Sequence, residues 1–186
     1  DTASAHKIRA STLNARSETM FDKPSFKDAA SVQRCVVPVS GFYEYHHQGR
    51  KSFPYYIYPR EKDQFLLAGL LSEWLQPETG ELQQTFSIVT TSANALLALI
   101  HNNPKLKGPR MPVILDDAEV DKWLLHEVNT KADQQALKSL CNPLEVEKMH
   151  CHNVKSLLGK EALGNVPDAK ETLEYPELAF FNLEIE

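Results

Sequence analysis

Residues 34–46 read RCVVPVSGFYEYH, and this stretch decides how the middle of the chain folds. Its residues are mostly apolar and alternate poorly with polar ones, which predicts a strand that is buried on both faces. Gly41 favours a bulge or the close approach of another backbone segment. Glu44 stands between Tyr43 and Tyr45. A carboxylate enclosed by aromatic rings is suited to holding and releasing a proton, whereas strand alternation would turn Glu44 toward solvent, and both interpretations stay open.

Around this stretch the sequence predicts further neighbouring strands. Residues 53–58 are aromatic and favour β-structure, and residues 64–75 and 85–91 form two more strand candidates. Residues 48–51 and 77–80 have the composition of tight turns. Strands that follow one another with such short connections predict an antiparallel meander.

The second half of the chain predicts helices. Residues 24–32 and 93–100 are each expected to form a short helix, and capping signals at 116–119 and 130–133 open two more. Residues 144–152 are expected to form a late strand. The predicted fold class is therefore α+β: one domain over residues 1–186, with a mostly antiparallel, barrel-like sheet and peripheral helices.

Composition restricts the possible classes of protein. No apolar run approaches the ~20 residues that a membrane-spanning helix needs, so we expect no membrane contact. The three cysteines, Cys35, Cys141 and Cys151, are too few and too irregular for a disulfide framework, which suits the cytoplasm. His150-Cys151-His152 matches no metal-site spacing, and we expect neither a metal nor a cofactor.

The charge of the chain is unevenly distributed. The formal net charge is −5, which argues against binding nucleic acid over the whole surface. Residues 1–60 nevertheless hold nine Lys or Arg against five Asp or Glu. This asymmetry indicates either chance combined with an acidic tail or a local basic surface near the start of the chain.

Several polar residues are candidates for a site that acts on an anionic substrate. Asn14 and Arg16 are two residues apart, so on a strand they point the same way, and a guanidinium suits a phosphate. Glu18 falls on that face too and is an alternative partner for Arg16. His101 ends a predicted helix, where an imidazole either exchanges protons or simply caps the last turn. Arg110 follows a loop, 102–109, whose Lys105 and Lys107 fit either anion binding or a solvated surface.

Taken together, these residues resemble the SRAP family, the SOS-response-associated peptidases that act on abasic sites in the DNA-damage response. The resemblance covers residues 8–160, in the family's order. Its motifs are Asn14-Ala15-Arg16-x-Glu18-Thr19, Arg34-Cys35, Gly41-Phe42-Tyr43-Glu44, Pro54-Tyr55-Tyr56-Ile57-Tyr58, Ala68-Gly69 before Trp74, Ile88-Val89-Thr90-Thr91, and Ile100-His101 with Arg110-Met111-Pro112. The resemblance implies a cleft for single-stranded DNA with abasic sites, and we expect a monomer.

The resemblance also implies a role for each candidate residue. Asn14 would orient a free amino terminus, and Glu44 would donate and accept protons while the initiator Met is removed and an imine forms. His101 would help to open the sugar ring. Arg16 and Arg110 would hold DNA phosphates.

The sequence differs from the family's pattern in two ways. The family's nucleophile is a cysteine directly after the initiator Met, which none of the three cysteines matches, so we expect the domain to be N-terminally incomplete. Eight residues, 102–109, separate His101 from Arg110, where many members have a very short link. The alternatives are a single-stranded-DNA-binding module without chemistry and a cysteine hydrolase that uses Cys35 and His101.

Overall fold

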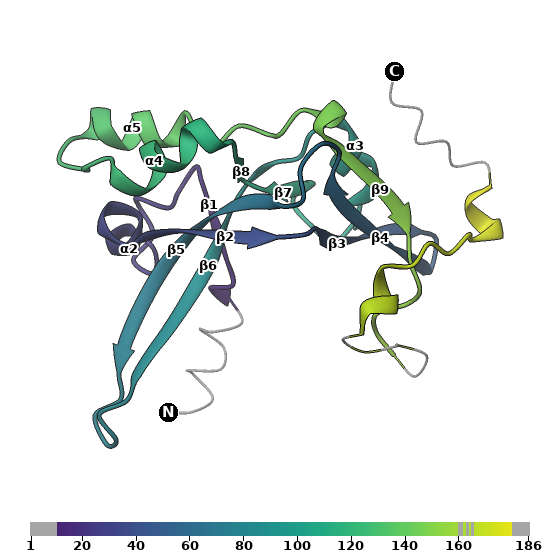
Figure 1. Ribbon diagram of the computed structural model, residues 1–186, viewed down its shortest axis with the longest axis horizontal. Coiled ribbons are helices and arrows are strands. Elements are labelled where there is room, and N and C mark those ends of the chain that lie inside the picture. The colour runs from purple at the N-terminus through teal and green to yellow at the C-terminus, as the bar shows by residue number, and fades with distance from the viewer. Residues whose placement is uncertain (1–10, 160–161, 163, 165, 180–186) are drawn as a thin grey trace. The chain divides into compact units, whose positions relative to one another are not determined.

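The computed structural model describes residues 11–159, 162, 164 and 166–179, and the chain divides into two compact units. The first unit comprises Asp1–Pro38, Leu66–Thr91 and Pro112–Pro143, and the second comprises Val39–Phe65, Ser92–Met111 and Leu144–Glu186. Because each unit is assembled from three separate segments, residues far apart in sequence meet within it. Figure 1 labels the helices and strands.

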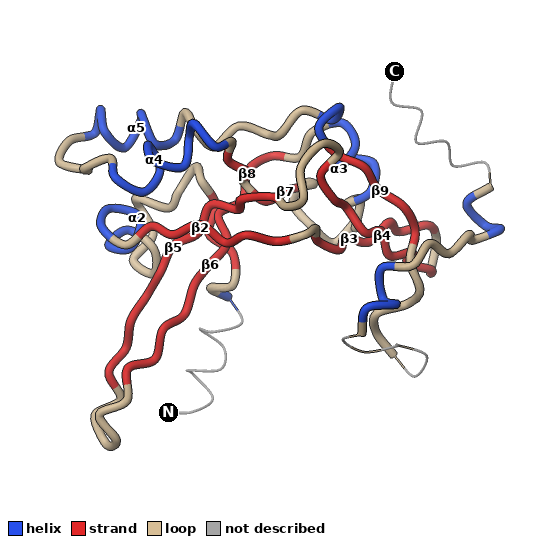
Figure 2. Tube along the Cα trace, in the orientation of Figure 1, coloured by secondary structure: helices blue, strands red, loops and turns tan. Residues whose placement is uncertain are grey.

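A six-stranded sheet lies mostly in the first unit. Its strands are β1 (Asn14–Arg16), β2 (Arg34–Val39), β5 (Phe65–Leu75), β6 (Leu82–Ser92), β7 (Arg110–Pro112) and β8 (Ile114–Leu115). The order is β1-β6-β5-β2, with β7 beside β6 and β8 beside β5. Strands β5 and β6 form a long antiparallel hairpin, whereas β1 runs parallel to β6. Figure 2 shows this hairpin as two long red strands.

Three helices accompany this sheet: α2 (Lys27–Val32), α4 (Asp117–Leu125) and α5 (Lys131–Lys138). Both predicted capping signals are confirmed. In α4 the Asp116 carboxylate accepts from the Glu119 N–H at 2.8 Å, and the Glu119 carboxylate accepts from the Asp116 N–H at 3.0 Å. Thr130 and Asp133 form the same reciprocal pair at the start of α5. Each pair satisfies donors that the first helical turn leaves without partners.

Arg34 ties two helix ends together in the first unit. Its Nη1 donates to the carbonyls of Ala30 and Ser31, at 2.7 and 2.8 Å, in the last turn of α2. Its Nε donates to the carbonyl of Trp123 at 2.5 Å, and its Nη2 donates to that of His126, at the end of α4. One guanidinium thus satisfies carbonyls that both helix ends would leave unpaired.

The second unit contains a three-stranded antiparallel sheet. Its strands are β3 (Phe42–Gln48), β4 (Lys51–Pro59) and β9 (Met149–Asn153), in the order β3-β4-β9. The predicted turn between β3 and β4 is confirmed, with Gly49 at φ +61. Among the described residues this unit also contains α3 (Ala95–Ile100) and the 3₁₀ turns η1 (Val146–Lys148), η2 (Pro167–Lys170) and η3 (Pro176–Leu178).

The prediction of one doubly buried strand over residues 34–46 is wrong, and so is the simple meander. The chain leaves β2 at Val39 and starts β3 at Phe42, and the two strands belong to different sheets. Most of their residues are only partly buried. The expected close approach at Gly41 is confirmed, because a Cβ there would lie 2.4 Å from the carbonyl oxygen of Ile57 and 2.6 Å from the ring of Tyr56.

The predicted fold class is confirmed: the chain is α+β, with curled and mostly antiparallel sheet and few helices. In the first unit Trp123 is fully buried in a hydrophobic cluster with Val89 and Leu70. In the second unit Ile57 and Ile100 are fully buried. Among the described residues, no helix is both long and apolar enough to cross a membrane. The single domain stays a prediction.

Replacing Gly41 by Ala should destabilise the protein more than replacing Gly49 by Ala. A methyl group at Gly41 meets a main-chain oxygen, which a side-chain rotation cannot relieve, whereas Gly49 has open space and only its left-handed φ costs about 1–2 kcal/mol. Urea unfolding of the two variants and the wild type measures the difference. A Gly41→Ala midpoint equal to that of the wild type would contradict the close approach.

Candidate active site

Glu44 and His101 come together within the second unit. Glu44 is the third residue of β3 and lies opposite Tyr55 of β4, while His101 is the C-cap residue of α3. The Glu44 Oε2 lies 3.4 Å from the His101 Nδ1, and the two side chains are 25% and 19% exposed. The Glu44 side chain is therefore partly buried, and its carboxylate lies beside an imidazole.

The Nδ1 of His101 is also held by the main chain of Arg110. It lies 2.8 Å from the Arg110 carbonyl oxygen and 3.3 Å from the Arg110 nitrogen. Nδ1 donates to the carbonyl if it carries the proton and accepts from the Arg110 N–H if it does not. The shorter distance to the carbonyl, together with the Glu44 carboxylate nearby, favours the tautomer with the proton on Nδ1 and the lone pair on Nε2. In that tautomer Nε2 is the ring nitrogen that can accept a hydrogen bond or a proton.

The second oxygen of Glu44 is fixed by the backbone as well. The N–H of Tyr45 donates to Glu44 Oε1 at 3.0 Å. One carboxylate oxygen is thus anchored to β3, and the other faces the imidazole. This division orients the carboxylate through one main-chain contact and one side-chain contact.

Asn102 was missed by the sequence analysis, which placed it only in a loop. Its Oδ1 accepts from the His47 N–H at 2.6 Å, and its Nδ2 donates to the His47 carbonyl at 3.0 Å. Its Nδ2 also lies 3.1 Å from the Nδ1 of the buried His46, which lies 3.0 Å from the Leu99 carbonyl. Asn102 therefore fastens the end of α3 to β3, one residue after His101. Its position beside His101 was the only available signal.

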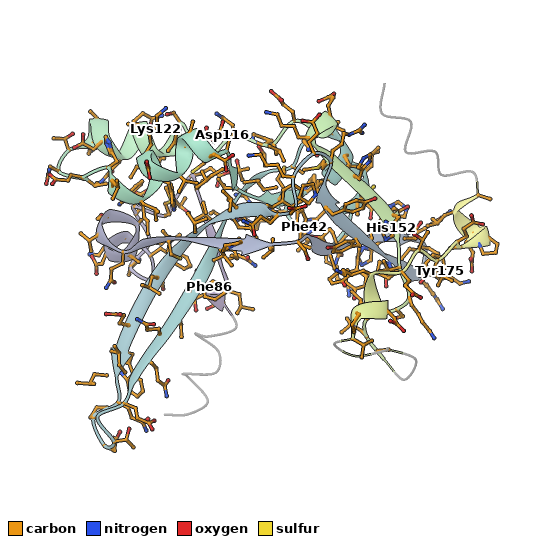
Figure 3. The ribbon with its side chains drawn as sticks, in the orientation of Figure 1. Phe42, Phe86, Asp116, Lys122, His152 and Tyr175 are labelled. Carbon is orange, nitrogen blue, oxygen red and sulfur yellow. The ribbon has the colours of Figure 1, made fainter. Side chains whose placement is uncertain are left out.

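Aromatic rings cover the opposite face of the same sheet. Tyr43 packs on Tyr56 with centroids 5.2 Å apart, and Tyr56 stacks on Tyr58 at 5.5 Å. His150 and His152 lie on this face and contact those rings, and Figure 3 labels His152. Among the described residues no group of three or more potential ligands is placed to hold a metal ion.

Asn14 and Arg16 lie on β1 in the first unit. Both are exposed, while Ala15 between them is fully buried, so the predicted alternation is confirmed. Strand β1 is fixed by its parallel pairing with β6, in which Asn14 lies opposite Ile88 and Arg16 opposite Thr90. Of the candidate residues, Glu44, His101 and Arg110 belong to the second unit.

None of the three thiols is placed as an activated nucleophile. Burial raises the pKa of Cys141 to about 12 and that of Cys151 to about 11. Burial also raises the pKa of Cys35, whose carbonyl accepts from the Trp123 indole at 3.0 Å. A raised pKa keeps a thiol protonated, which is the opposite of what a cysteine hydrolase needs.

Comparisons with known proteins assign the chain to a protein family. The family model "SOS response associated peptidase (SRAP)" matches residues 1–161. The chain is 35% identical over 171 residues to "Abasic site processing protein YoqW" of Bacillus subtilis (strain 168), covering 91% of this chain and 71% of that protein. It is 34% identical over 165 residues to "Abasic site processing protein HMCES" of Gallus gallus, covering 77% and 46%. A crystal structure of a protein from Bacteroides thetaiotaomicron has a TM-score of 0.80 at 38% identity, covering 94% of this chain and 71% of that one. The resemblance noted from the motifs is confirmed, and the chain belongs to the SRAP family.

Proposed function

We propose that this protein processes abasic sites in single-stranded DNA and links itself covalently to them. The observation that carries the proposal is the 3.4 Å contact between Glu44 and His101, with the imidazole held by the main chain of Arg110, in a chain of the SRAP family. Relatives of this chain named abasic site processing proteins support the choice of substrate.

The first chemical step is the opening of the abasic sugar. An abasic site is a cyclic hemiacetal that masks an aldehyde, and ring opening moves a proton from the anomeric hydroxyl to the ring oxygen. His101 in its charged form would donate a proton to the ring oxygen, and the neutral imidazole would take up the proton that the anomeric hydroxyl releases. Glu44 beside it would stabilise the charged ring.

The second step traps the aldehyde. An α-amine adds to the aldehyde carbon and water leaves, which gives an imine. The thiol of the same residue then adds to the imine carbon, its proton passes to the imine nitrogen, and a thiazolidine ring closes. Glu44 would accept the amine proton and donate one to the departing hydroxyl. Cys35, Cys141 and Cys151 are internal and lack a free α-amine, so the step is proposed for a polypeptide whose first residue is a cysteine, as the family resemblance implies.

The same carboxylate would act in exposing that amine. Removal of an initiator Met is a peptide hydrolysis that needs a base for water and an acid for the leaving amine, and Glu44 can alternate between both roles. Asn14 would orient the new amino terminus, because an amide can donate and accept hydrogen bonds at once. The proposed activities are therefore a self-directed peptidase step followed by DNA crosslinking.

The DNA itself would be held by a few fixed cations. The chain carries a net charge of −5, so diffuse attraction cannot supply the affinity. Arg16, exposed on β1, and Arg110 would each contact a phosphate. The alternative is a DNA-binding module without chemistry, for which the same arginines would suffice.

Replacing Glu44 by Gln should slow adduct formation by about 10²–10⁴-fold, the usual effect of a positioned acid–base group. The amide keeps the size of the side chain but cannot exchange the proton. The assay follows a denaturation-resistant adduct with an abasic single-stranded oligonucleotide, using a polypeptide that starts with cysteine.

Glu61→Gln is the matched control, because Glu61 is exposed on a loop after β4, and it should leave the rate unchanged. Equal rates for Glu44→Gln and the wild type would remove Glu44 from the mechanism. Reversible retention without any adduct, in both proteins, would favour the binding module.

Replacing Arg16 by Ala should weaken binding of single strands of every sequence about equally, since phosphate contacts carry no base information. The slope of log affinity against log salt should become shallower by about 0.7, the value of one phosphate on a single strand. Arg50→Ala, in the exposed turn after β3, removes the same charge and should leave the slope unaltered. Unchanged slopes for Arg16→Ala would show that another residue holds the phosphate.

The native thiols should react slowly with iodoacetamide at pH 8. Because burial raises the pKa values of Cys141 and Cys151 to about 12 and 11, their thiolate fractions stay small until the pH approaches those values. Unfolding returns the pKa values to about 8.5, so alkylation in guanidinium should be at least tenfold faster. Mass spectrometry of each cysteine measures the alkylation rates. If Cys35 reacted faster in the native protein than in the unfolded protein, the cysteine hydrolase alternative would be favoured again.

A further inference from the structure

The loop between His101 and Arg110 carries a concentration of positive charge. Residues 102–109, hereafter the basic loop, contain Lys105 and Lys107 and no acidic residue, and Arg110 follows directly. This contrasts with a chain whose net charge is −5. We propose that the basic loop is a second contact surface for the DNA backbone beside the Glu44–His101 pair, with Lys105 and Lys107 on phosphates and Leu106 against a sugar or base. This inference rests on the proposed function.

The loop is anchored at both ends to the candidate site. Asn102 at its start is fastened to the main chain of His47, and Arg110 after its end holds the Nδ1 of His101. Both lysines therefore lie in a loop whose two ends are tied to β3 and to His101. Lys105 is four residues from His101, so its Cα lies within about 14 Å of the His101 Cα, since a chain extends at most ~3.6 Å per residue.

The tip of the loop has a defined turn. The Lys105 N–H donates to the Asn103 side chain at 3.0 Å, and the Leu106 N–H donates to the Asn103 carbonyl at 3.0 Å. Gly108, at φ +143, allows a backbone conformation that side chains rarely adopt. These contacts hold the backbone of residues 103–106 in a turn, so Lys105, Leu106 and Lys107 follow one another at its tip.

The two lysines are exposed and have no protein partner in the part of the chain that the structure describes. If a carboxylate of the protein paired with these lysines, their charge would be neutralised and they would serve only to hold the loop in place. Without one, their charge is available to an anion from solution, and a phosphodiester beside the lesion is the anion that the proposed reaction brings there. Lysine suits this contact because a phosphate can accept from an ammonium in many orientations.

Leu106 stands between the lysines and is 47% exposed. Water solvates an exposed apolar side chain poorly. Leu106 can remove its apolar surface from water by packing on the unstacked bases or sugars of a single strand. Such packing adds affinity without neutralising charge. The loop would thus make two kinds of contact: phosphate contacts, whose affinity falls as the salt concentration rises, and an apolar contact, which leaves the salt slope unchanged.

The test measures reversible binding of a single-stranded oligonucleotide that contains tetrahydrofuran, an abasic analogue without an aldehyde, at several salt concentrations. The variant Lys105→Gln/Lys107→Gln should make the salt slope shallower by about 1.4, or 0.7 for each phosphate contact. Leu106→Ala should weaken binding with the slope unchanged. The matched control is Lys122→Gln/Lys131→Gln, which removes the same charge from exposed positions on α4 and α5 and should keep the wild-type slope.

The outcomes separate this inference from the proposed function. A loop variant with the wild-type slope, in a protein that binds and crosslinks DNA, overturns only the basic loop as a contact surface. An equal change of slope in loop and control variants also overturns it, because the effect would then be general. A wild-type protein that binds neither the analogue nor a true abasic strand overturns both proposals.

Discussion

The close approach of Gly41 to strand β4 is the constraint on which the geometry of the candidate site depends. With no side chain at this position, the backbone can pass beside the Ile57 carbonyl and begin β3 at Phe42, opposite Ile57. That start fixes the register and places Glu44 opposite Tyr55. A slip of one residue would move every side chain of β3 to the other face of the sheet, so Glu44 could not meet His101.

Main-chain groups hold both members of the Glu44–His101 pair. The Tyr45 N–H fixes one carboxylate oxygen, and the Arg110 carbonyl fixes Nδ1 of the ring. Asn102 acts in the same way, because its partners at His47 are a backbone N–H and carbonyl. A site built on such contacts keeps its geometry when neighbouring side chains change, and on the proposed function it would need little reorganisation during proton transfer.

Local sequence signals predicted the helix caps and turns, but they did not predict which distant segments pair with one another. The capping boxes at Asp116 and Thr130 and the turn at Gly49 each depend on a few adjacent residues, and all were predictable. The parallel pairing of β1 with β6 joins segments that share no local pattern. The contact of Asn102 with His47 could not be predicted for the same reason, since His47 lies 55 positions earlier and contributes only main-chain atoms. Glu44 and His101 were identified from their motifs, but their contact required the fold.

An acidic protein that binds an anion must separate affinity from selectivity. Phosphate contacts at fixed arginines and lysines act on any strand, because they carry no information about the bases. An intact nucleotide has no masked aldehyde, so on the proposed function the reactive pair responds only to a lesion. Selectivity then comes from the chemical step, and modest binding is an advantage, because undamaged strands dissociate quickly. On the proposed function a net charge of −5 serves this division, since it opposes non-specific retention while the basic loop and Arg110 keep positive charge in the segment that follows His101.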